Sequence, residues 1–507
     1  MIVLTASLAA ILQVIDTSIV NVALTDMQSS LGATLSEVGW VITSYAIATI
    51  IVIPLSAWLG DYFGKKRYFV FSIAGFTIAS ILCGLSTSLP MLIVARLLQG
   101  FAGGGLIPMA QAILFQTFPK EEQGKAQAIF GIGVIAGPAI GPTLGGYLTT
   151  NMSWPWIFYV NIPFGIAAVV MALQYLPESP KVRKVGASVD WLGIGLLIVA
   201  LGAIQWVLEE GHSEDWFESR AIVIGSFIGF VTFILFIWRE LRARHPAVDL
   251  RVLKHRSVAA GSLFSAVLGM GLYGAIFVIP IFAQSMLHLT AQQTGMLLLP
   301  GALASAVMMP IMGKLTSFID PRILIACGAL VVVFSMVMLG GMSTQTGVDD
   351  LFWPLIWRGA GTVMMFLPLS LATLGPVPQK DLPAASGFYN LTRQLGGSIG
   401  IAVLTTLLSQ RVALHRSNML EHYSAYNPAT SNRLELFTQG FMSRGVDQVT
   451  AHKQALQVMS GSVSGQSSVM SFNDIFVVVG IAFVASLPLL LLMGKGSAKA
   501  VGPSTDH

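Results

Sequence analysis

Charged residues are scarce in this sequence: only 10% of the 507 residues are Asp, Glu, Lys or Arg, and 54% are hydrophobic. A soluble domain carries about 25% charged residues, so a large soluble enzyme, a basic nucleic-acid-binding protein and a disordered chain are excluded. The two cysteines are too few for a disulfide scaffold or a thiolate metal site, and no metal site is expected. No GxxxxGK[ST] loop is present, so ATP is not the expected energy source. The composition indicates an integral membrane protein in a lipid bilayer.

Fourteen apolar runs follow one another along the chain, each close to the roughly 20 residues that cross a bilayer as a helix. Spans are expected near 3–24, 37–60, 67–87, 90–113, 126–149, 155–176, 190–208, 220–238, 257–284, 292–315, 321–342, 351–374, 384–409 and 474–494. Because they take up most of the chain, no soluble enzyme domain is expected between them. The first run lacks a preceding basic region and a following cleavage site, so it is not expected to be a cleavable signal.

Basic residues gather in alternate connections between the runs, which sets the expected orientation. They include Lys65, Lys66, Arg67, Lys120, Lys125, Lys181, Arg183, Lys184, Lys314, Arg322 and Lys380. The opposite connections hold Arg220 beside an acidic run at 209–218. By the positive-inside rule, both termini are expected in the cytoplasm.

One connection on the outer side, 410–473, is unusually long and polar. Within it, Asn432–Met442 and Gln448–Met459 are predicted to be short amphipathic helices. Loops of this length are uncommon unless they are functional or disordered. Two interpretations stay open: a passive cap, or a docking surface for a partner outside the membrane.

A weak internal repeat predicts the domain plan. The segment AWLGDYFGKKR from Ala57 to Arg67 has a degraded counterpart, GKLTSFIDPR, from Gly313 to Arg322, and Arg96 corresponds to Arg358. We therefore predict an all-α fold of two six-helix halves plus two inserted helices, with any transport site at the interface of the halves. The expected parts are 1–178, the inserted pair 186–240, the second half 257–494 and a cytoplasmic tail 495–507.

Asp16 is the one carboxylate deep in the first half's expected membrane region. It belongs to the stretch LQVIDTSIVNVAL, in which Gln13, Asp16, Thr17 and Asn21 share one helical face. An intramembrane acid costs about 2.5–3.5 kcal/mol on insertion scales and indicates function by default. We predict proton coupling at Asp16; the alternative is a structural hydrogen bond to a neighbouring helix.

Arg96 is the expected partner of Asp16, because both fall roughly 10–12 Å from the outer end of their spans. A buried arginine needs an acceptor. The alternative is that Arg96 bonds backbone carbonyls or Gln99 instead. Acceptors for Arg358 and Arg393, which are also at membrane depth, cannot be assigned from the pattern.

Small residues recur every four positions in GIGVIAGPAIGPTLGG, at Gly133, Gly137, Gly141 and Gly145. This spacing predicts a smooth face for close helix packing. Pro138 and Pro142 are expected to kink the helix, so the segment is both a packing face and a candidate bending element.

The connection from Gly60 to Arg67 (GDYFGKKR) combines an acid with three bases around Gly64. Asp61 is predicted to cap and charge-pair with helix ends when the inner side is shut and to release them when it opens, with Gly64, Lys65 and Arg67 as parts of the same candidate gate. A plain solvated turn is the alternative.

Several side chains at membrane depth are candidates for an apolar cavity with a few polar groups. They are Gln13, Asn21, Trp40, Tyr45, Met109, Gln111, Phe158, Tyr389, Asn390 and Arg393. Aromatic and Met side chains at helical spacing are more often core or lipid-facing.

These motifs resemble those of a known family. GDYFGKKR is similar to the inner-loop signature of the major facilitator superfamily, with Ala57 in place of its usual Gly, and RLLQG is similar to its fourth-helix signature. GPAIGPTLGG resembles the signature of its antiporters. LQVIDTSIVNVAL, WVITSY, FYNLTRQLGGSIG and the long last outer loop before FNDIF resemble the fourteen-span drug:proton antiporters, EmrB-type multidrug exporters above all.

The resemblance implies export of lipophilic, often aromatic drugs across the inner membrane, driven by the proton gradient without a cofactor. It implies a periplasmic membrane-fusion adaptor and an outer-membrane channel as partners. It also implies that Asp16 is the proton-coupling acid, Arg96 the fourth-helix arginine and Asp61 a gating acid. A proton-coupled transporter of one specific metabolite is the main alternative, because fold does not fix substrate. A scaffold or channel without coupling is a further alternative, and it would show drug flux that does not change when the proton gradient is collapsed. A membrane enzyme fits least well, because no nucleophile–base pair or metal cluster is found at one depth.

Overall fold

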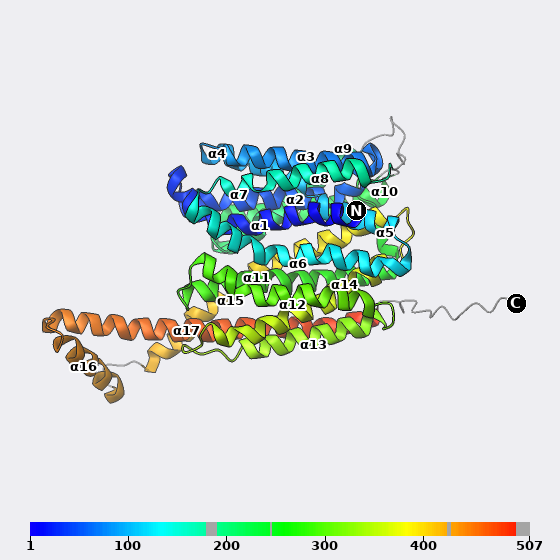
Figure 1. Cartoon of the computed structure of the whole chain (residues 1–507). Coiled ribbons are helices and arrows are strands. Elements are labelled where there is room, and N and C mark those ends of the chain that lie inside the picture. The colour runs from blue at the N-terminus through cyan, green and yellow to red at the C-terminus, as the bar shows by residue number, and fades with distance from the viewer. Residues whose placement is uncertain (179–189, 244–245, 423–426, 493–507) are drawn as a thin grey trace.

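The structure of the chain, a computed structural model, is a bundle of helices with one long projection (Figure 1). It describes residues 1–178, 190–243, 246–422 and 427–492. The helices that follow the fourteen predicted spans are α1 (Ile2–Leu31), α2 (Leu35–Phe63), α3 (Lys65–Gly84), α4 (Leu89–Gly103), α5 (Leu106–Thr117), α6 (Lys120–Asn151), α7 (Trp156–Tyr159), α8 (Asn161–Tyr175), α9 (Trp191–Glu210), α10 (Arg220–Arg242), α11 (Arg256–Ser285), α12 (Ala291–Leu315), α13 (Pro321–Leu339), α14 (Phe352–Leu374), α15 (Leu382–His422) and α17 (Gln448–Ser486), with α16 (Pro428–Met442) between the last two.

The predicted all-α fold and its fourteen spans are confirmed. Within the described residues the chain has no strand, and fourteen helical segments are long and apolar enough to cross a membrane. Two predicted spans are each built from two helices, α4–α5 and α7–α8. The first break falls at Gly104 and Gly105, and the second falls at Val160, just before Pro163, which cannot donate the backbone hydrogen bond that would continue the helix.

The bundle has two ends that differ in charge. We call the end that carries the connections α2–α3, α5–α6, α10–α11, α12–α13 and α14–α15 the basic end, and the opposite end the hairpin end. The amino terminus lies at the basic end (Figure 1). The projection at the hairpin end is formed by α16 and by the extended parts of α15 and α17.

The prediction that the polar segment 410–473 is a long loop is wrong, because most of its described residues are helical. The helix α15 continues through it to His422, and Gln448–Met459 is the start of the 39-residue α17, not a separate short helix. The predicted helix Asn432–Met442 lies within α16. The residues 409–422 contain neither Pro nor Gly, so the loss of hydropathy ends the apolar run without ending the helix.

The helix α6 lies between the first and the second part of the bundle. It contacts α1 on one side and α12 on the other, as Figure 1 shows. The buried side chains form apolar clusters in the first part of the chain and a larger cluster over α11–α17. The domain boundaries stay a prediction; residues 179–189, which include the start of the inserted pair, and the tail 495–507 lie outside the described residues.

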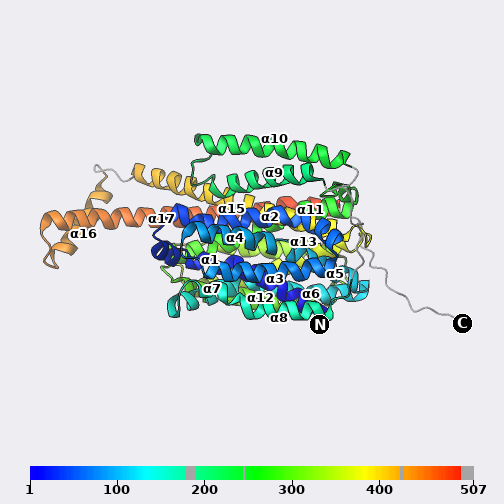
Figure 2. The same cartoon turned by 90° about the horizontal axis from the view of Figure 1, so that it is seen from above.

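The helices α9 and α10 lie along one side of the bundle, with α10 outermost (Figure 2). A shared apolar cluster joins them to α2 and α15 through residues such as Ile50, Leu197, Phe236 and Leu391. Gln205 in α9 also donates a 3.0 Å hydrogen bond to Ser398 in α15. The inserted pair therefore covers the seam between α2 and α15.

Candidate functional site

Asp16 lies near the middle of α1 and is fully buried. Its Oδ2 accepts a 2.6 Å hydrogen bond from Nη1 of Arg96 in α4, so the two predicted partners form a buried ion pair. Its Oδ1 accepts from Nε2 of Gln99 at 2.8 Å and from Nδ2 of Asn161 at 2.9 Å. An ionised carboxylate is acceptor-only, and every one of these neighbours is a donor.

Arg96 also contacts a backbone carbonyl and Gln99, the two kinds of acceptor that were the alternative to Asp16. Its Nε donates to the carbonyl of Val41 in α2 at 3.0 Å, and its Nη1 lies 2.7 Å from Oε1 of Gln99. Its guanidinium carbon lies 4.0 Å from the centroid of the Tyr45 ring and 5.8 Å from that of Phe158. The guanidinium thus ties α1, α2 and α4 together under an aromatic cover.

Asn161 was not predicted as a site residue. The break between α7 and α8 places it at the start of α8, where its amide reaches both Asp16 and, at 3.1 Å, Oγ of Ser80. The signal available in the sequence was a polar side chain two residues before Pro163 inside an apolar run. That pattern also fits an ordinary helix cap, so it does not by itself predict a site residue.

The predicted polar face of α1 is divided. Gln13 is buried and its Oε1 accepts a 3.3 Å hydrogen bond from the backbone N–H of Ile107, just after the α4–α5 break. Thr17 and Asn21 are exposed. Asp16 therefore lies one residue from an accessible strip on the same helix.

The glycine face of α6 packs directly on α1. A Cβ added to Gly133 or Gly137 would overlap Ile11 or closely approach Val14, and one added to Gly141 would overlap Ser18. Ser18 is two residues from Asp16, and its Oγ lies 3.4 Å from the carbonyl oxygen of Gly137. The helix runs unbroken from Lys120 to Asn151 through Pro138 and Pro142. The face predicted for packing thus holds the helix that carries the buried acid.

A second polar network crosses the bundle between α5 and α15. Nε2 of Gln111 donates to Oγ of Ser370 in α14 at 2.8 Å, and Oε1 of Gln111 accepts from Nδ2 of Asn390 at 2.8 Å. Oδ1 of Asn390 accepts from Nη2 of Arg393 at 2.6 Å. All four side chains are buried. Three of the predicted cavity residues are therefore joined, at a contact between the first and last thirds of the chain.

The other predicted cavity residues lie at different places in the bundle and do not form a single cavity with this network. Tyr389 is fully buried on α15, and Tyr45 and Phe158 cover Arg96. Met109 is buried against Gly60 near the basic end. Trp40 is 37% exposed at the hairpin-end half of α2.

The basic end holds the predicted loop residues. Gly64, with φ of 89°, joins α2 to α3, a conformation that favours glycine. Nζ of Lys65 donates to Oε1 of Gln116 at 2.6 Å, and Nε2 of Gln116 donates to the carbonyl of Gln379 before α15 at 2.8 Å. This chain of bonds links both parts of the bundle at the basic end.

Asp61 and Arg67 occupy different places at the same end. Asp61 is partly buried and lines a cavity of about 230 Å³ with Arg251, Lys380 and Asp381 among its neighbours. Arg67 is exposed. Asp61 thus lies beside residues from the far part of the chain.

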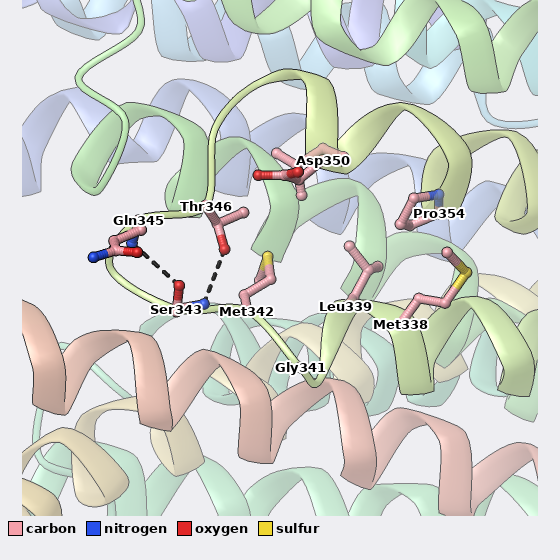
Figure 3. Close-up of a pocket in the computed structure, with 10 residues that line it drawn as sticks. Met338, Leu339, Gly341, Met342, Ser343, Gln345, Thr346, Asp350 and Pro354 are labelled. Atoms are coloured by element: carbon pink, nitrogen blue, oxygen red, sulfur yellow. Dashed lines mark hydrogen bonds between the residues drawn. The ribbon is translucent and has the colours of Figure 1, made fainter.

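A larger cavity of about 410 Å³ lies at the hairpin end, beside the connection from α13 to α14 (Figure 3). The backbone N–H of Ser343 donates to Oγ1 of Thr346 at 2.9 Å, and that of Gln345 donates to Oγ of Ser343 at 3.2 Å. None of the predicted cavity residues lines it. In the described part of the chain, no three His, Cys, Asp or Glu side chains are grouped so as to hold a metal ion.

Comparison with known proteins decides the family. The family model of the Major Facilitator Superfamily matches residues 6–401. The chain belongs to the major facilitator superfamily. Membership indicates a transporter, and one that spans the membrane many times. Two solved structures from the superfamily have the same fold: the human organic anion transporter MFSD10 (TM-score 0.62, 13% identity, 96% of this chain and 98% of that one) and the proton:xylose symporter XylE (TM-score 0.60, 12%, 95% and 94%).

Relatives with higher identity lie within the superfamily's exporters. The chain is 34% identical to the multidrug export protein EmrB of Escherichia coli K12 over 97% of this chain and 96% of that one. It is 31% identical to the fatty acid resistance protein FarB of Neisseria gonorrhoeae (96% and 95%) and 30% identical to the colistin resistance protein EmrB of Acinetobacter baumannii (95% and 94%). The resemblance to EmrB-type exporters is confirmed, and the chain is a superfamily transporter of the multidrug-export kind.

Proposed function

We propose that this transporter is a proton-driven antiporter that exports lipophilic drugs across the inner membrane by alternating access. The observation that carries the proposal is the buried ion pair of Asp16 and Arg96, 2.6 Å apart at membrane depth. Such a pair is expensive to bury, and ionisable groups inside a membrane mark substrate paths and proton relays.

Protonation of Asp16 is the coupling step in this proposal. A proton on Oδ2 removes the charge that faces Arg96, and a buried guanidinium without its counter-charge is strongly unfavourable. Because Arg96 joins Asp16 to the Val41 carbonyl, the relation of α1, α2 and α4 depends on that proton. The exposed strip at Thr17 and Asn21 offers a path toward the hairpin end, which we place outside the cytoplasm because the other end is basic.

The energy of one proton suffices for export. Each 100 mV supplies about 2.3 kcal/mol per charge. A driving force of roughly 150–200 mV therefore gives about 3.5–4.6 kcal/mol, or several-hundred-fold to about two-thousand-fold accumulation of a neutral solute.

The bonds at the basic end fit a gate. Lys65, Gln116 and the Gln379 carbonyl connect the two parts of the bundle there, and Asp61 lines the adjoining cavity. Opening toward the cytoplasm requires these bonds to break, and closing restores them.

The test is transport by purified protein in proteoliposomes with an imposed proton gradient. Lipophilic drug is expected to accumulate against its own gradient while protons cross the membrane in the opposite direction. A protonophore is expected to abolish the accumulation. Drug flux that is unchanged after the gradient is collapsed would reject the antiporter. Counterflow in which one polar metabolite alone competes would favour the metabolite transporter, which the buried polar network around Gln111 and Asn390 also suits.

We further propose that the projection at the hairpin end docks a periplasmic adaptor, which leads to an outer-membrane channel. Its base is fixed by Asp474 in α17, whose Oδ2 lies 2.9 Å from Nε2 of His415 and 3.6 Å from Nε of Arg411 in α15. Its tip carries exposed apolar side chains, including Leu436 (68% exposed) and Val449 (67%). Exposed apolar groups beyond the membrane can serve as anchors for a partner surface.

Replacing both tip residues, Leu436→Asp and Val449→Asp, is expected to weaken the adaptor complex at least about tenfold, since buried apolar anchors dominate such interfaces. The measurement is the amount of co-expressed membrane-fusion adaptor that co-purifies with the exporter. Ser431→Asp, a change at another exposed position on α16, serves as the control, and drug–proton exchange in proteoliposomes should stay normal in all variants. Undiminished co-purification of the double variant would remove the docking role from this surface.

A further inference from the structure

Arg393 is a buried cation in the middle of the bundle. It lies eleven residues into α15, about 16 Å along the helix axis from the basic end, and is 5% exposed. Its guanidinium carbon is 5.1 Å from the ring centroid of Phe366 and 5.8 Å from that of Tyr389. It therefore lies at the depth of a transport site, between two aromatic rings.

This guanidinium has no carboxylate partner among the described residues. Nη2 donates to the neutral amide oxygen of Asn390 at 2.6 Å, and Nη1 has no acceptor. Arg96 differs in this respect, because it is equally buried but paired with Asp16. An uncompensated buried charge is strongly unfavourable, so a negative charge from outside the described chain would find a large stabilisation here.

The surroundings of Arg393 belong to both parts of the bundle. Asn390 is bonded to Gln111 of α5, and Phe366 faces the backbone of α6 at Gly131. The side chain of Tyr389, one turn before Arg393, is also fully buried. A guanidinium group with an unpartnered Nη1 thus lies beside aromatic rings at the contact between α5, α6, α14 and α15.

We propose that Arg393 is a specificity-determining residue that binds the carboxylate of amphipathic anionic substrates. A carboxylate matches the planar fork of the guanidinium, with Phe366 and Tyr389 contacting the apolar body of the same molecule. This inference rests on the proposed export of lipophilic compounds and narrows it to a preference for those that carry one negative charge.

The experiment compares two probes that share one apolar body: 1-pyrenebutanoate, which is anionic, and 1-pyrenebutanol, which is neutral. Their binding to the purified full-length protein in nanodiscs is followed by pyrene fluorescence at neutral pH without a proton gradient. The wild-type protein is expected to bind the butanoate at least about tenfold more tightly, which corresponds to about 1.4 kcal/mol. Arg393→Gln is expected to remove that preference and leave butanol binding unchanged, and Arg393→Lys to keep part of it.

The controls distinguish a failure of the anion site from a failure of the proposed export of lipophilic compounds. Arg358→Gln, at another membrane-depth arginine whose Nε also lacks a partner, should leave both affinities unchanged. Normal binding of pyrenebutanol by Arg393→Gln shows that its site is folded. If that variant does not fold, the ratio of the wild-type affinities for pyrenebutanoate and pyrenebutanol still tests the proposal. Equal wild-type affinities for the two probes, or an equal loss of both in Arg393→Gln, would overturn the anion site while leaving lipophilic export standing. Wild-type protein that binds and transports neither probe would overturn both.

Discussion

A protein carrying Asp16→Asn is expected to bind drug but to lose proton-driven export. The asparagine keeps the size of the side chain and its hydrogen bonds to Gln99 and Asn161, but it cannot take up and release a proton. In proteoliposomes with an imposed gradient, the steady-state accumulation should fall from several-hundred-fold to about one. Asp26→Asn, on an exposed position of the same helix, is the matched control and should accumulate drug normally.

The same pair makes a second measurement possible. Removing one partner of a buried ion pair costs about 3–5 kcal/mol because the other charge is left uncompensated. The double variant Asp16→Asn/Arg96→Gln should therefore lose less free energy of unfolding than the two single variants together. Full accumulation by Asp16→Asn, or strictly additive losses in this cycle, would show that the pair is not the coupling element.

Gly141→Leu is expected to lower the free energy of unfolding and to abolish transport. A Cβ on Gly141 would overlap Oγ of Ser18 and come within 2.8 Å of its Cβ and 3.0 Å of the backbone nitrogen of Ile19. The backbone of α1 must move to make room, and overpacking of this kind costs about 1–3 kcal/mol or more. Since α1 carries Asp16, its distance to Arg96 changes too.

Thermal unfolding in detergent and drug accumulation in proteoliposomes measure the two effects. Gly195→Leu is the control, because Gly195 lies in membrane-depth α9 with open space where its Cβ would be. Gly141→Ala should show a smaller loss, and adding Ser18→Gly to it should restore much of that loss. A stable, fully active Gly141→Leu protein would contradict the close packing of α1 and α6.

The bilayer explains why so much of the fold was predictable. A span needs a fixed length of apolar sequence, so the fourteen runs correspond to the fourteen helical segments of the described residues that could cross a membrane. The ends of α15 and α17 were misplaced because hydropathy marks the edge of the membrane and not the end of a helix. The pattern held no sign that these two helices continue as one projection.

The candidate site was predictable where the energetic cost of a charge at membrane depth requires a partner of opposite charge. Asp16 and Arg96 are both expensive at membrane depth and fall at the same height, so their pairing followed from helix geometry. Asn161 was missed because an asparagine at a helix boundary has a commoner explanation. The packing face of α6 was predicted, but its contact with α1 is a fact of tertiary structure that no local pattern contains.

The unbroken course of α15 has a mechanical consequence. One rigid rod runs from the buried Arg393 to His422 in the projection, a distance of about 44 Å at 1.5 Å per residue. A tilt of roughly 10° about its buried part would swing the far tip by about 8 Å. Small adjustments around a cargo molecule inside the bilayer would thereby be magnified into a displacement that a neighbouring protein outside it could sense, with no separate signalling element needed.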